Sequence, residues 1–423
     1  MQKMTIHWIL IFASLFLILN HSVRAGEECP VVEDNTAYGF IPTVVRGNTA
    51  FALDLYARLS KEGNGNLFFS PYSISTALAM TYAGAAGETG EQMSQVLHFP
   101  ENQAQAKLHP AFSHLQDQVN EVNQEGKIEL RTANALWVQR GYPFKANFKG
   151  LVGNYYKAPL NQADFATEAE ETRQDINLWV ETITHDKIIE LLGAGSLDSL
   201  SRLVLVNAIY FKGNWASQFE SDDTHDAPFW VNQKQPVTVP MMNQEHSFKY
   251  MANYDIQILE LPYAHTASDA NSISMIIILP KQRGGLPELE RSLSAWQLKD
   301  WLSRLRLRNI KVFLPKFKTS TSFELSGTLK KMGMLAAFNE NADFSCIDGT
   351  RNLSITSVVH QAFVDVNEEG SEAAAATGVV FGVRSMAFAP PTFRADHPFI
   401  FLIRHNLSGS ILFMGRIVDP SES

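Results

Sequence analysis

The chain has 423 residues, a formal net charge of −9 at pH 7, 45% hydrophobic and 19% charged residues. This composition is that of an ordinary globular protein, and the negative charge argues against a nucleic-acid-binding surface. No Pro/Ser/Gly-rich linker, block of charge or internal repeat divides the chain, so we expect one large domain in spite of its length.

The N-terminus has the pattern of an export signal. Lys3 precedes an apolar run, Trp8–Leu19, and a run of about twelve residues suits a signal-peptide core but is too short to span a bilayer. Val23 and Ala25 fit the small-residue rule for cleavage. We therefore interpret residues 1–25 as a signal peptide, 26–45 as a polar leader and 46–423 as the folded domain. The expected product is secreted and soluble, with no membrane partner.

Hydrophobic periodicity predicts helices mainly in the first half of the chain and strands in the second. Leu203–Phe211 is nearly all apolar, which is typical of a central strand buried on both faces. Helices are expected over Thr49–Leu59, Ser73–Ala83 (started by Pro71), Lys107–Gln124, Arg173–Leu192 and 286–305. Further strands are expected over Leu67–Phe69, Ile128–Val138, 246–261, 272–280, 310–318, 353–366, 398–404 and 410–418. This order of elements indicates an α+β fold with a large mixed sheet.

Two patterns that look catalytic have simpler interpretations. The glycine-rich segment Gly84–Gly90 follows a predicted helix and lacks the lysine of a phosphate-binding loop, so we interpret it as a connection between helices. His360 with Ser70 or Ser73 could form a catalytic pair, but the chain has neither a Gly-x-Ser-x-Gly elbow nor a His-Glu-x-x-His zinc motif. We expect no enzymatic activity, no metal site and no cofactor.

The two cysteines, Cys29 and Cys346, are far apart in the sequence. They could pair in an oxidising compartment, but a fold of this size does not need a disulfide to be stable, so their pairing stays open. Glycosylation at the sequons Asn352 and Asn406 stays open as well.

Residues 368–391 combine the features of an exposed loop with those of a strand. Three glycines weaken a helix by about 1 kcal/mol each, and the valines and phenylalanine near the centre favour a strand. No proline occurs before Arg384, so no donor of a sheet hydrogen bond is missing there. The residues concerned are Gly370, Gly378 and Gly382, then Val379, Val380, Phe381 and Val383, and small side chains at Ser371, Ala373 and Ala375 that could enter a packed core.

This segment resembles the reactive-centre loop of the serpins, whose acid-acid-Gly-Ser/Thr-Glu-Ala-Ala-Ala hinge precedes a bait residue. The resemblance extends over nearly all of the chain after residue 45 and is carried by further motifs in the right order. They begin with Asn-Leu-Phe-Phe-Ser-Pro-Tyr-Ser-Ile-Ser over Asn66–Ser75 and continue through Asn207–Trp215, Leu314–Lys318, Val358–Ala362 and Asp396–Ile403. Five such motifs identify the chain as a member of the serpin family.

The resemblance implies a fold and a set of site residues. Serpins have three β-sheets, eight or nine helices and a reactive-centre loop held above the main sheet. The matching positions imply a buried polar cluster under the sheet, the shutter, made of Ser70, Ser73, Asn207 and His360. They also imply a breach at the top of the sheet, where Trp215 lies near an ion pair between Lys316 and Glu368. The hinge comprises Glu368, Glu369, Gly370, Ser371, Glu372, Ala373, Ala374, Ala375, Ala376 and Thr377.

In inhibitory serpins the cleaved bond lies fourteen residues after the hinge glycine, which here gives Arg384–Ser385. The resemblance implies that a protease is trapped as a covalent acyl complex when the cleaved loop inserts into the main sheet. Arginine as bait fits trypsin-like serine proteases. Phe381, Met386 and Phe388 are alternative baits for chymotrypsin-like enzymes, but each departs from the inhibitory spacing.

A non-inhibitory serpin, acting as carrier, storage protein or chaperone, is the alternative. Such members usually have bulky, charged or proline residues in the hinge, and Ser371–Thr377 has none of these apart from the family's own glutamate. Heparin is not expected as a partner because the stretch Lys107–Gln124 has one lysine and no arginine. We expect a monomer.

Overall fold

The computed structural model describes residues 38–100, 105–123, 127–264, 272–371 and 389–422. Ten α-helices lie within these ranges, against the eight or nine expected, and three of them have seven residues or fewer. The helical elements are η1 (Tyr38–Phe40), α2 (Ile41–Glu62), α3 (Pro71–Tyr82), α4 (Gly87–Val96), α5 (Gln105–Asn120), α6 (Ala146–Tyr156), α7 (Phe165–Ile183), η3 (Ser221–Asp223), α8 (Leu286–Ser292), α9 (Ala295–Ser303), α10 (Ser326–Met332), η5 (Ala336–Phe338) and α11 (Ser345–Asp348).

The strands form two hydrogen-bonded sheets among the described residues. The strands are β1 (Leu67–Phe69), β2 (Ile128–Gln139), β3 (Leu160–Ala163), β4 (Leu203–Asn214), β5 (His225–Trp230), β6 (Pro236–Ala252), β7 (Ile256–Pro262), β8 (Ile273–Pro280), β9 (Arg306–Pro315), β10 (Phe317–Glu324), β11 (Ile355–Val366), β12 (Gly370–Ser371), β13 (Thr392–Arg394), β14 (Phe399–His405) and β15 (Ile411–Ile417).

The six-stranded sheet has the order β10-β11-β4-β2-β3, with β12 paired to β4 outside this path. The central pair β11–β4 is parallel, and each of these strands has an antiparallel neighbour on its other side. The nine-stranded sheet runs from β1 to β13. Within it β6 pairs with β5 near its start, with β9 from Met241 to Tyr250 and with β7 through Lys249–Ala252. Because these pairings are continuous, two of the three expected sheets form one hydrogen-bonded sheet.

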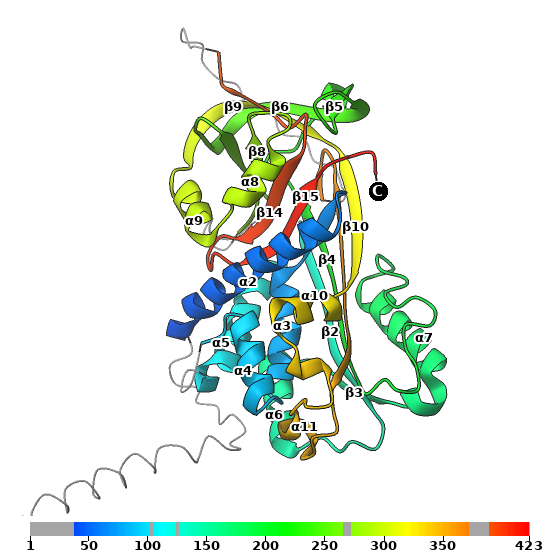
Figure 1. The fold of residues 1–423 in the computed structure, drawn as a ribbon. Coiled ribbons are helices and arrows are strands. Elements are labelled where there is room, and N and C mark those ends of the chain that lie inside the picture. Colours follow the sequence, from blue (N-terminus) through cyan, green and yellow to red (C-terminus); the bar gives the residue numbers. More distant parts are fainter. Residues whose placement is uncertain (1–37, 101–104, 124–126, 265–271, 372–388, 423) are drawn as a thin grey trace, which may run out of the picture.

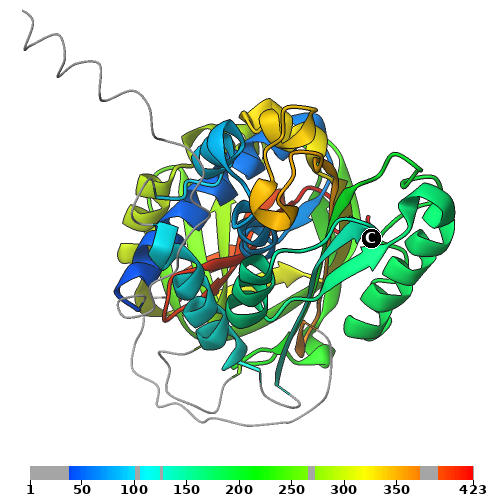
Figure 2. The ribbon, with the colours of Figure 1, turned by 90° about the horizontal axis from the view of Figure 1, so that it is seen from below.

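Helices cover both faces of the six-stranded sheet. Figures 1 and 2 show α2 to α6 on one side and α7 alone on the other. The side chains of β4 alternate accordingly: Leu203, Leu205 and Ile209 join the core on the side of α3, whereas Val204 and Val206 pack beneath α7. Every residue of β4 except Lys212 is buried, so the predicted central strand is confirmed and extends three residues further, to Asn214.

Several predicted boundaries are wrong, and local chemistry explains each difference. Helix α7 ends at Ile183 rather than Leu192, because His185 and Asp186 adopt positive φ of 51° and 62°, which a helix cannot continue through. The predicted helix 286–305 is divided, since Ser294 accepts a hydrogen bond from the Gln297 amide and starts α9.

Helix α2 begins at Ile41, eight residues before the predicted start and inside the segment interpreted as a leader. Ile41, Val44 and Val45 are buried, and Pro42 lies in the first turn, where its missing N–H costs nothing. The predicted strand over 246–261 is two strands, because the Asn253 side chain accepts hydrogen bonds from the amides of Asp255 and Ile256 and forms a turn.

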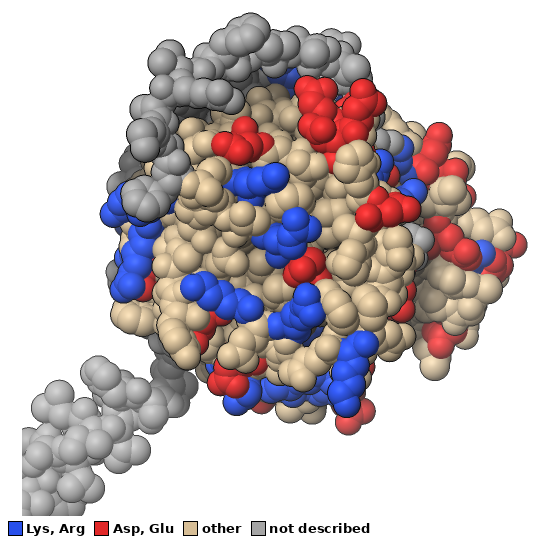
Figure 3. All heavy atoms as spheres, turned by 90° about the horizontal axis from the view of Figure 1, so that it is seen from above, with Lys and Arg blue, Asp and Glu red and all other residues tan. Residues whose placement is uncertain are grey.

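The face shown in Figure 3 has no continuous field of one charge among the described residues. Viewed from above, from the end where β5, β6 and β9 lie, Lys and Arg side chains are spread over the middle of the face and Asp and Glu gather towards one side (Figure 3). Among the described helices, none combines the length and the apolar character that crossing a bilayer would require.

Candidate functional site

Three strands of the six-stranded sheet bring polar side chains together at one level. Asn134 of β2 and His360 of β11 are both register partners of Asn207 in β4. Under them, Ser70 caps the N-terminus of α3, where its hydroxyl accepts a hydrogen bond from the Ser73 amide. Pro71 then occupies the first helical position, so the sequence itself fixes where the helix begins.

The shutter residues form one hydrogen-bonded cluster with Asn134. The Ser70 backbone amide donates to His360 Nε2 at 3.0 Å, and the side-chain Nδ2 of Asn207 donates to Ser73 Oγ at 2.5 Å. Ser73 Oγ donates to Asn134 Oδ1 at 3.2 Å, and Asn207 hydrogen-bonds both Asn134 and His360. Since these polar groups lie between apolar strands, their mutual hydrogen bonds offset the cost of burying them.

This geometry determines the protonation of His360. Nε2 accepts from the Ser70 amide and is therefore unprotonated, while Nδ1 donates to Asn207 Oδ1. Burial lowers the pKa of His360 to about 3, so the imidazole is neutral at physiological pH. Among the described residues, the two ring nitrogens are hydrogen-bonded to the Ser70 backbone amide and to Asn207 rather than to a carboxylate, so the arrangement differs from a Ser-His-Asp triad.

Asn134 is the member of this cluster that the sequence analysis did not identify. Its amide oxygen accepts hydrogen bonds from two shutter residues, Ser73 and Asn207. The available signal was a polar residue within the largely apolar strand 128–138. That signal becomes specific only when the register places Asn134 opposite Asn207.

At the top of the sheet, Lys316 and Glu368 form the expected ion pair, with Nζ 2.8 Å from the nearer carboxylate oxygen. Thr224 Oγ1 also donates to Glu368, at 2.9 Å. Burial alone would raise the pKa of Glu368, but the hydrogen bonds from Lys316 and Thr224 and the lysine charge together hold it below its usual value. Glu368 is therefore an anion held in place by two side chains.

Trp215 holds the turn that follows β11. Its indole Nε1 donates to the backbone oxygen of Asn367 at 3.0 Å, and its backbone amide donates to that of Glu369 at 2.8 Å. The Asn367 side chain accepts hydrogen bonds from the amides of Glu369 and Gly370. Trp215 also stacks on Tyr263 with ring centroids 4.5 Å apart, so the breach residues fix the chain at the point where the hinge begins.

The first hinge residues have already entered the sheet. Strands β4 and β11 are paired only as far as Tyr210 and Phe363, and above that level Gly370 and Ser371 pair with Asn214 and Gly213 of β4. Gly370 has φ +150°, and a Cβ atom there would lie 2.0 Å from the Gly213 oxygen. Only glycine fits this approach. Ser371 is fully buried, with Oγ 3.2 Å from the Tyr263 hydroxyl.

The remaining predicted site residues lie outside the described part of the chain. They are the reactive bond Arg384–Ser385 and the hinge residues from Glu372 to Thr377. The predicted signal peptide and Cys29 also lie outside it. Cys346 is buried in α11 and disulfide-bonded. No group of three or more His, Cys, Asp or Glu side chains within the described ranges could hold a metal ion.

Comparison with known proteins identifies the family. Residues 46–420 match the model of the family described as serpin (serine protease inhibitor). The chain is a serpin. It is 42% identical over 381 residues to a leukocyte elastase inhibitor of Xenopus laevis, a match that covers 88% of this chain and 98% of the relative. It is also 42% identical over 382 residues to an uncharacterized serpin-like protein of Thermococcus kodakarensis, covering 90% and 86%.

Solved structures agree with the predicted serpin fold. Uncleaved ovalbumin matches with a TM-score of 0.79 and 32% identity over 89% of this chain and 100% of its own. An Arabidopsis serpin in a native stressed conformation matches with a TM-score of 0.79 and 30% identity over 90% and 98%. The family and the relatives named as elastase inhibitors support protease inhibition as the activity of this serpin.

Proposed function

We propose that this serpin is a secreted suicide-substrate inhibitor of trypsin-like serine proteases, cleaved at Arg384–Ser385. The supporting observation is the gap between β4 and β11 above Tyr210 and Phe363, which β12 has begun to fill from the top. Ser371 to Arg384 comprises 14 residues (384 − 371 + 1), and β4 has 12. At about 3.3 Å per residue, the loop up to the bait is long enough to add a strand along the whole of β4.

The proposed reaction begins as ordinary proteolysis. The protease serine attacks the carbonyl carbon of Arg384, its proton passes through the protease histidine to the leaving amine of Ser385, and an acyl ester to Arg384 remains. The freed hinge then inserts between β4 and β11 and carries the attached protease along the sheet. Inhibition results when insertion is faster than hydrolysis of the ester.

Each site assumes a role in this step. In this proposal Lys316, Glu368 and Trp215 hold the top of the sheet in place, where the hinge begins to enter it. The shutter lies lower, where β4 and β11 are still paired and must separate, so its hydrogen bonds have to rearrange during insertion. In this proposal His360 is a neutral hydrogen-bonding residue rather than a base.

Arg384 carries the choice of target, because a trypsin-like primary pocket has an acidic group that pairs with arginine. A second candidate follows from the relatives, which are named leukocyte elastase inhibitors. Cleavage at Phe381, Met386 or Phe388 would correspond to a chymotrypsin-like target instead, at a loop length that departs from the family spacing.

Two experiments test this proposal. After reaction with trypsin, N-terminal sequencing of the released fragment is expected to begin at Ser385, and a denaturing gel is expected to contain a covalent serpin–trypsin band. A fragment that begins at Gly382, Ala387 or Ala389, or faster complex formation with chymotrypsin or elastase than with trypsin, would contradict the trypsin-like assignment. Secretion is tested by expressing the full chain and sequencing the exported product, which should begin at Gly26.

A further inference from the structure

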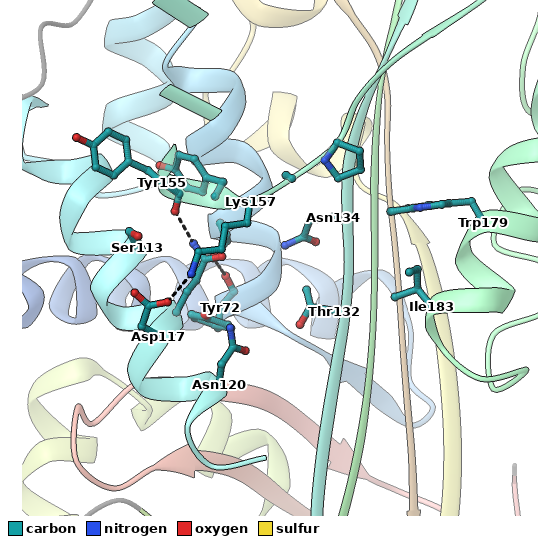
Figure 4. A pocket seen from close by; sticks show the side chains of 15 residues that line it. Tyr72, Ser113, Asp117, Asn120, Thr132, Asn134, Tyr155, Lys157, Trp179 and Ile183 are labelled. Carbon is teal, nitrogen blue, oxygen red and sulfur yellow. Dashed lines mark hydrogen bonds and ion pairs between the residues drawn. The ribbon is translucent and has the colours of Figure 1, made fainter. Parts of the chain in front are cut away.

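A cavity of about 310 Å³ lies beside the shutter, on the side of α5 and α6 (Figure 4). Its walls come from α3, α5, the end of α6, β2 and α7, with Trp179 and Ile183 at one end. The volume is at the lower end of the range of about 300–1,000 Å³ found for small-molecule sites. None of the described hinge residues, Glu368–Ser371, contributes to its lining.

The charged side chains of the described lining are already paired with each other. The lining contains one anion and one cation, Asp117 and Lys157, and these form an ion pair at 2.8 Å. The hydroxyl of Tyr72 stays protonated, since burial and the nearby charge of Asp117 raise its pKa well above the usual value. The remaining polar lining consists of hydroxyl, amide and indole groups. A neutral ligand matches this surface.

Several of these neutral groups have unused hydrogen-bonding capacity. The side chains of Tyr72, Ser113, Asn120, Thr132 and Trp179 make no hydrogen bond with another described residue through their polar atoms. They are distributed over four elements around one cavity, so a single ligand can meet several of them together. Tyrosine, tryptophan and isoleucine supply apolar surface beside these polar groups, which suits the C–H face of a sugar ring.

Asn134 connects the cavity with the shutter. Its Oδ1 accepts from Ser73 and Asn207, while Nδ2 has no partner among the described residues. Figure 4 shows the amide of Asn134 between the cavity and the sheet, with its nitrogen on the cavity side. A ligand oxygen that accepts from Nδ2 would hold this amide in its present orientation, and with it the hydrogen bonds to Ser73 and Asn207.

We propose that this cavity binds a neutral sugar of one or two rings, and that the bound sugar keeps the sheet closed through Asn134. The binding step is independent of the proposed inhibitory function, whereas its effect on sheet opening rests on that function. A sugar at about ten times its Kd would lower the unfolding equilibrium constant about elevenfold, because it binds the folded protein only. Insertion of the loop should slow in the same conditions.

Binding is tested first by saturation-transfer NMR on the full-length native protein, with glucose and maltose as neutral probes and glucuronate as a charged one. We expect transfer to glucose or maltose and none to glucuronate. In Ser113→Phe the new ring projects from α5 into the cavity, and transfer should disappear. Ser303→Phe, the same substitution at the exposed end of α9, should leave transfer unchanged.

Thr132→Val, which keeps the side-chain shape and removes one hydroxyl, should weaken sugar binding several-fold. If Ser113→Phe does not fold, this variant tests whether the sugar binds in the cavity. Heat-induced unfolding is then compared between wild type and these variants at equal sugar concentration, because sugars also stabilise folded proteins by exclusion from their surface. Absence of transfer to both neutral probes, equal transfer in wild type and the folded cavity variants, or equal binding of glucuronate would overturn the proposal. A normal covalent complex with trypsin alongside such a result would leave the inhibitory function intact.

Discussion

Single polar residues in buried strands control how the six-stranded sheet is held together. His360 is fully buried and neutral, and Asn207 lies between it and Asn134 on three neighbouring strands. Glu368 and Lys316 are partly buried at the top of the same sheet, with side-chain exposures of 11% and 39%. An apolar residue at any of these positions would leave its neighbour without a partner, at a cost of about 1–3 kcal/mol.

The ion pair at the breach predicts the effect of Glu368→Gln. Loss of the pair should remove about 1 kcal/mol of stabilisation at the top of the sheet and speed heat-induced polymerisation several-fold, measured by size-exclusion chromatography. Because the folded pKa of Glu368 is depressed, its contribution is complete above the unfolded value of about 4.3 and is lost as the pH falls through the folded pKa. The polymerisation rate of wild type should therefore approach that of Glu368→Gln at low pH.

Glu369→Gln is the matched control, since the adjacent Glu369 makes no ion pair with another described residue. It should polymerise at the wild-type rate. Equal rates for Glu368→Gln and Glu369→Gln would show that the pair does not restrain opening.

His360 predicts a second dependence on pH. Its folded pKa is about 3, against about 6.5 in an unfolded chain, so the unfolded state binds one more proton between these values. Stability is complete above pH 6.5 and falls by about 1.4 kcal/mol per pH unit below it. His109 is equally buried, with a pKa of about 3, and adds a slope of the same size. His360→Gln should therefore remove about half of the total slope, as measured by urea unfolding between pH 7 and 5.

His246→Gln, at an exposed position of β6, provides the comparison for this measurement and should keep the wild-type slope. Glutamine keeps one donor and one acceptor, so the shutter can retain its hydrogen bonds. If His360→Gln has the same slope as wild type, the imidazole is not buried in the neutral form.

At the level of elements, the decisive feature is the partial separation of β4 and β11. They are hydrogen-bonded up to Tyr210 and Phe363, and β12 occupies the gap above. Between Tyr210 and the residues paired with β12, the edge of β4 that faces β11 has no strand partner among the described residues, which favours the addition of a further strand. In the proposed insertion, the small side chains of Ser371, Ala373 and Ala375 would allow the hinge to fit between the two layers of core.

Ser371→Arg should convert the inhibitor into a substrate. Ser371 is fully buried beside Tyr263, and an arginine there would bury an unpaired charge at a cost of several kcal/mol. Arg384 is unchanged, so docking and acylation should persist while insertion slows. Trypsin should then cleave the variant and stay active, with the covalent band reduced at least tenfold on a denaturing gel.

Ser371→Ala, which keeps a small side chain, should inhibit like wild type. Ala373→Pro should behave like Ser371→Arg, because proline lacks the N–H that a central strand requires. Ala389→Pro, on the other side of the bait, is its control. Undiminished inhibition by both hinge variants would mean that this serpin blocks proteases without inserting its loop.

At the scale of the whole molecule, the helices and the nine-stranded sheet form the frame within which the proposed opening of the six-stranded sheet would take place. Helix α7 covers one face of that sheet, where its residues Ile176 and Val180 belong to one apolar cluster with Ala133 of β2 and Val204 of β4. The core on the other face is continuous with the larger sheet. A new strand between β4 and β11 would therefore be buried on both faces.

Cleaved wild-type protein should be much more heat-stable than native protein. Burial of Val379, Val380, Phe381 and Val383 contributes about 1.5–3 kcal/mol each, enough to raise the Tm by about 10 °C or more. Differential scanning calorimetry before and after trypsin cleavage measures this change, and cleaved Ser371→Arg should gain much less. An unchanged Tm for cleaved wild type would show that the cleaved loop does not insert into the sheet.

The sequence by itself determined the family, the α+β class and the buried strand β4, and the shutter residues were implied by the resemblance. Those features depend on local patterns: apolar runs, the Ser70-Pro71 helix start and the order of motifs. The ion pair between Lys316 and Glu368 also followed from sequence, through the resemblance. Helix ends were less predictable, as at His185, where the backbone takes a positive φ and the following chain turns back so that the Asn177 side chain hydrogen-bonds the backbone of Leu192.

Only the tertiary structure decided how far the hinge has entered the sheet. The pairing of Gly370 and Ser371 with β4 depends on the separation of two strands that are more than 140 residues apart in the chain (355 − 214 = 141). Asn134 and the cavity beside it were missed for the same reason. Strand register and the packing of five elements create them, and no local pattern in the sequence records a space that distant side chains enclose.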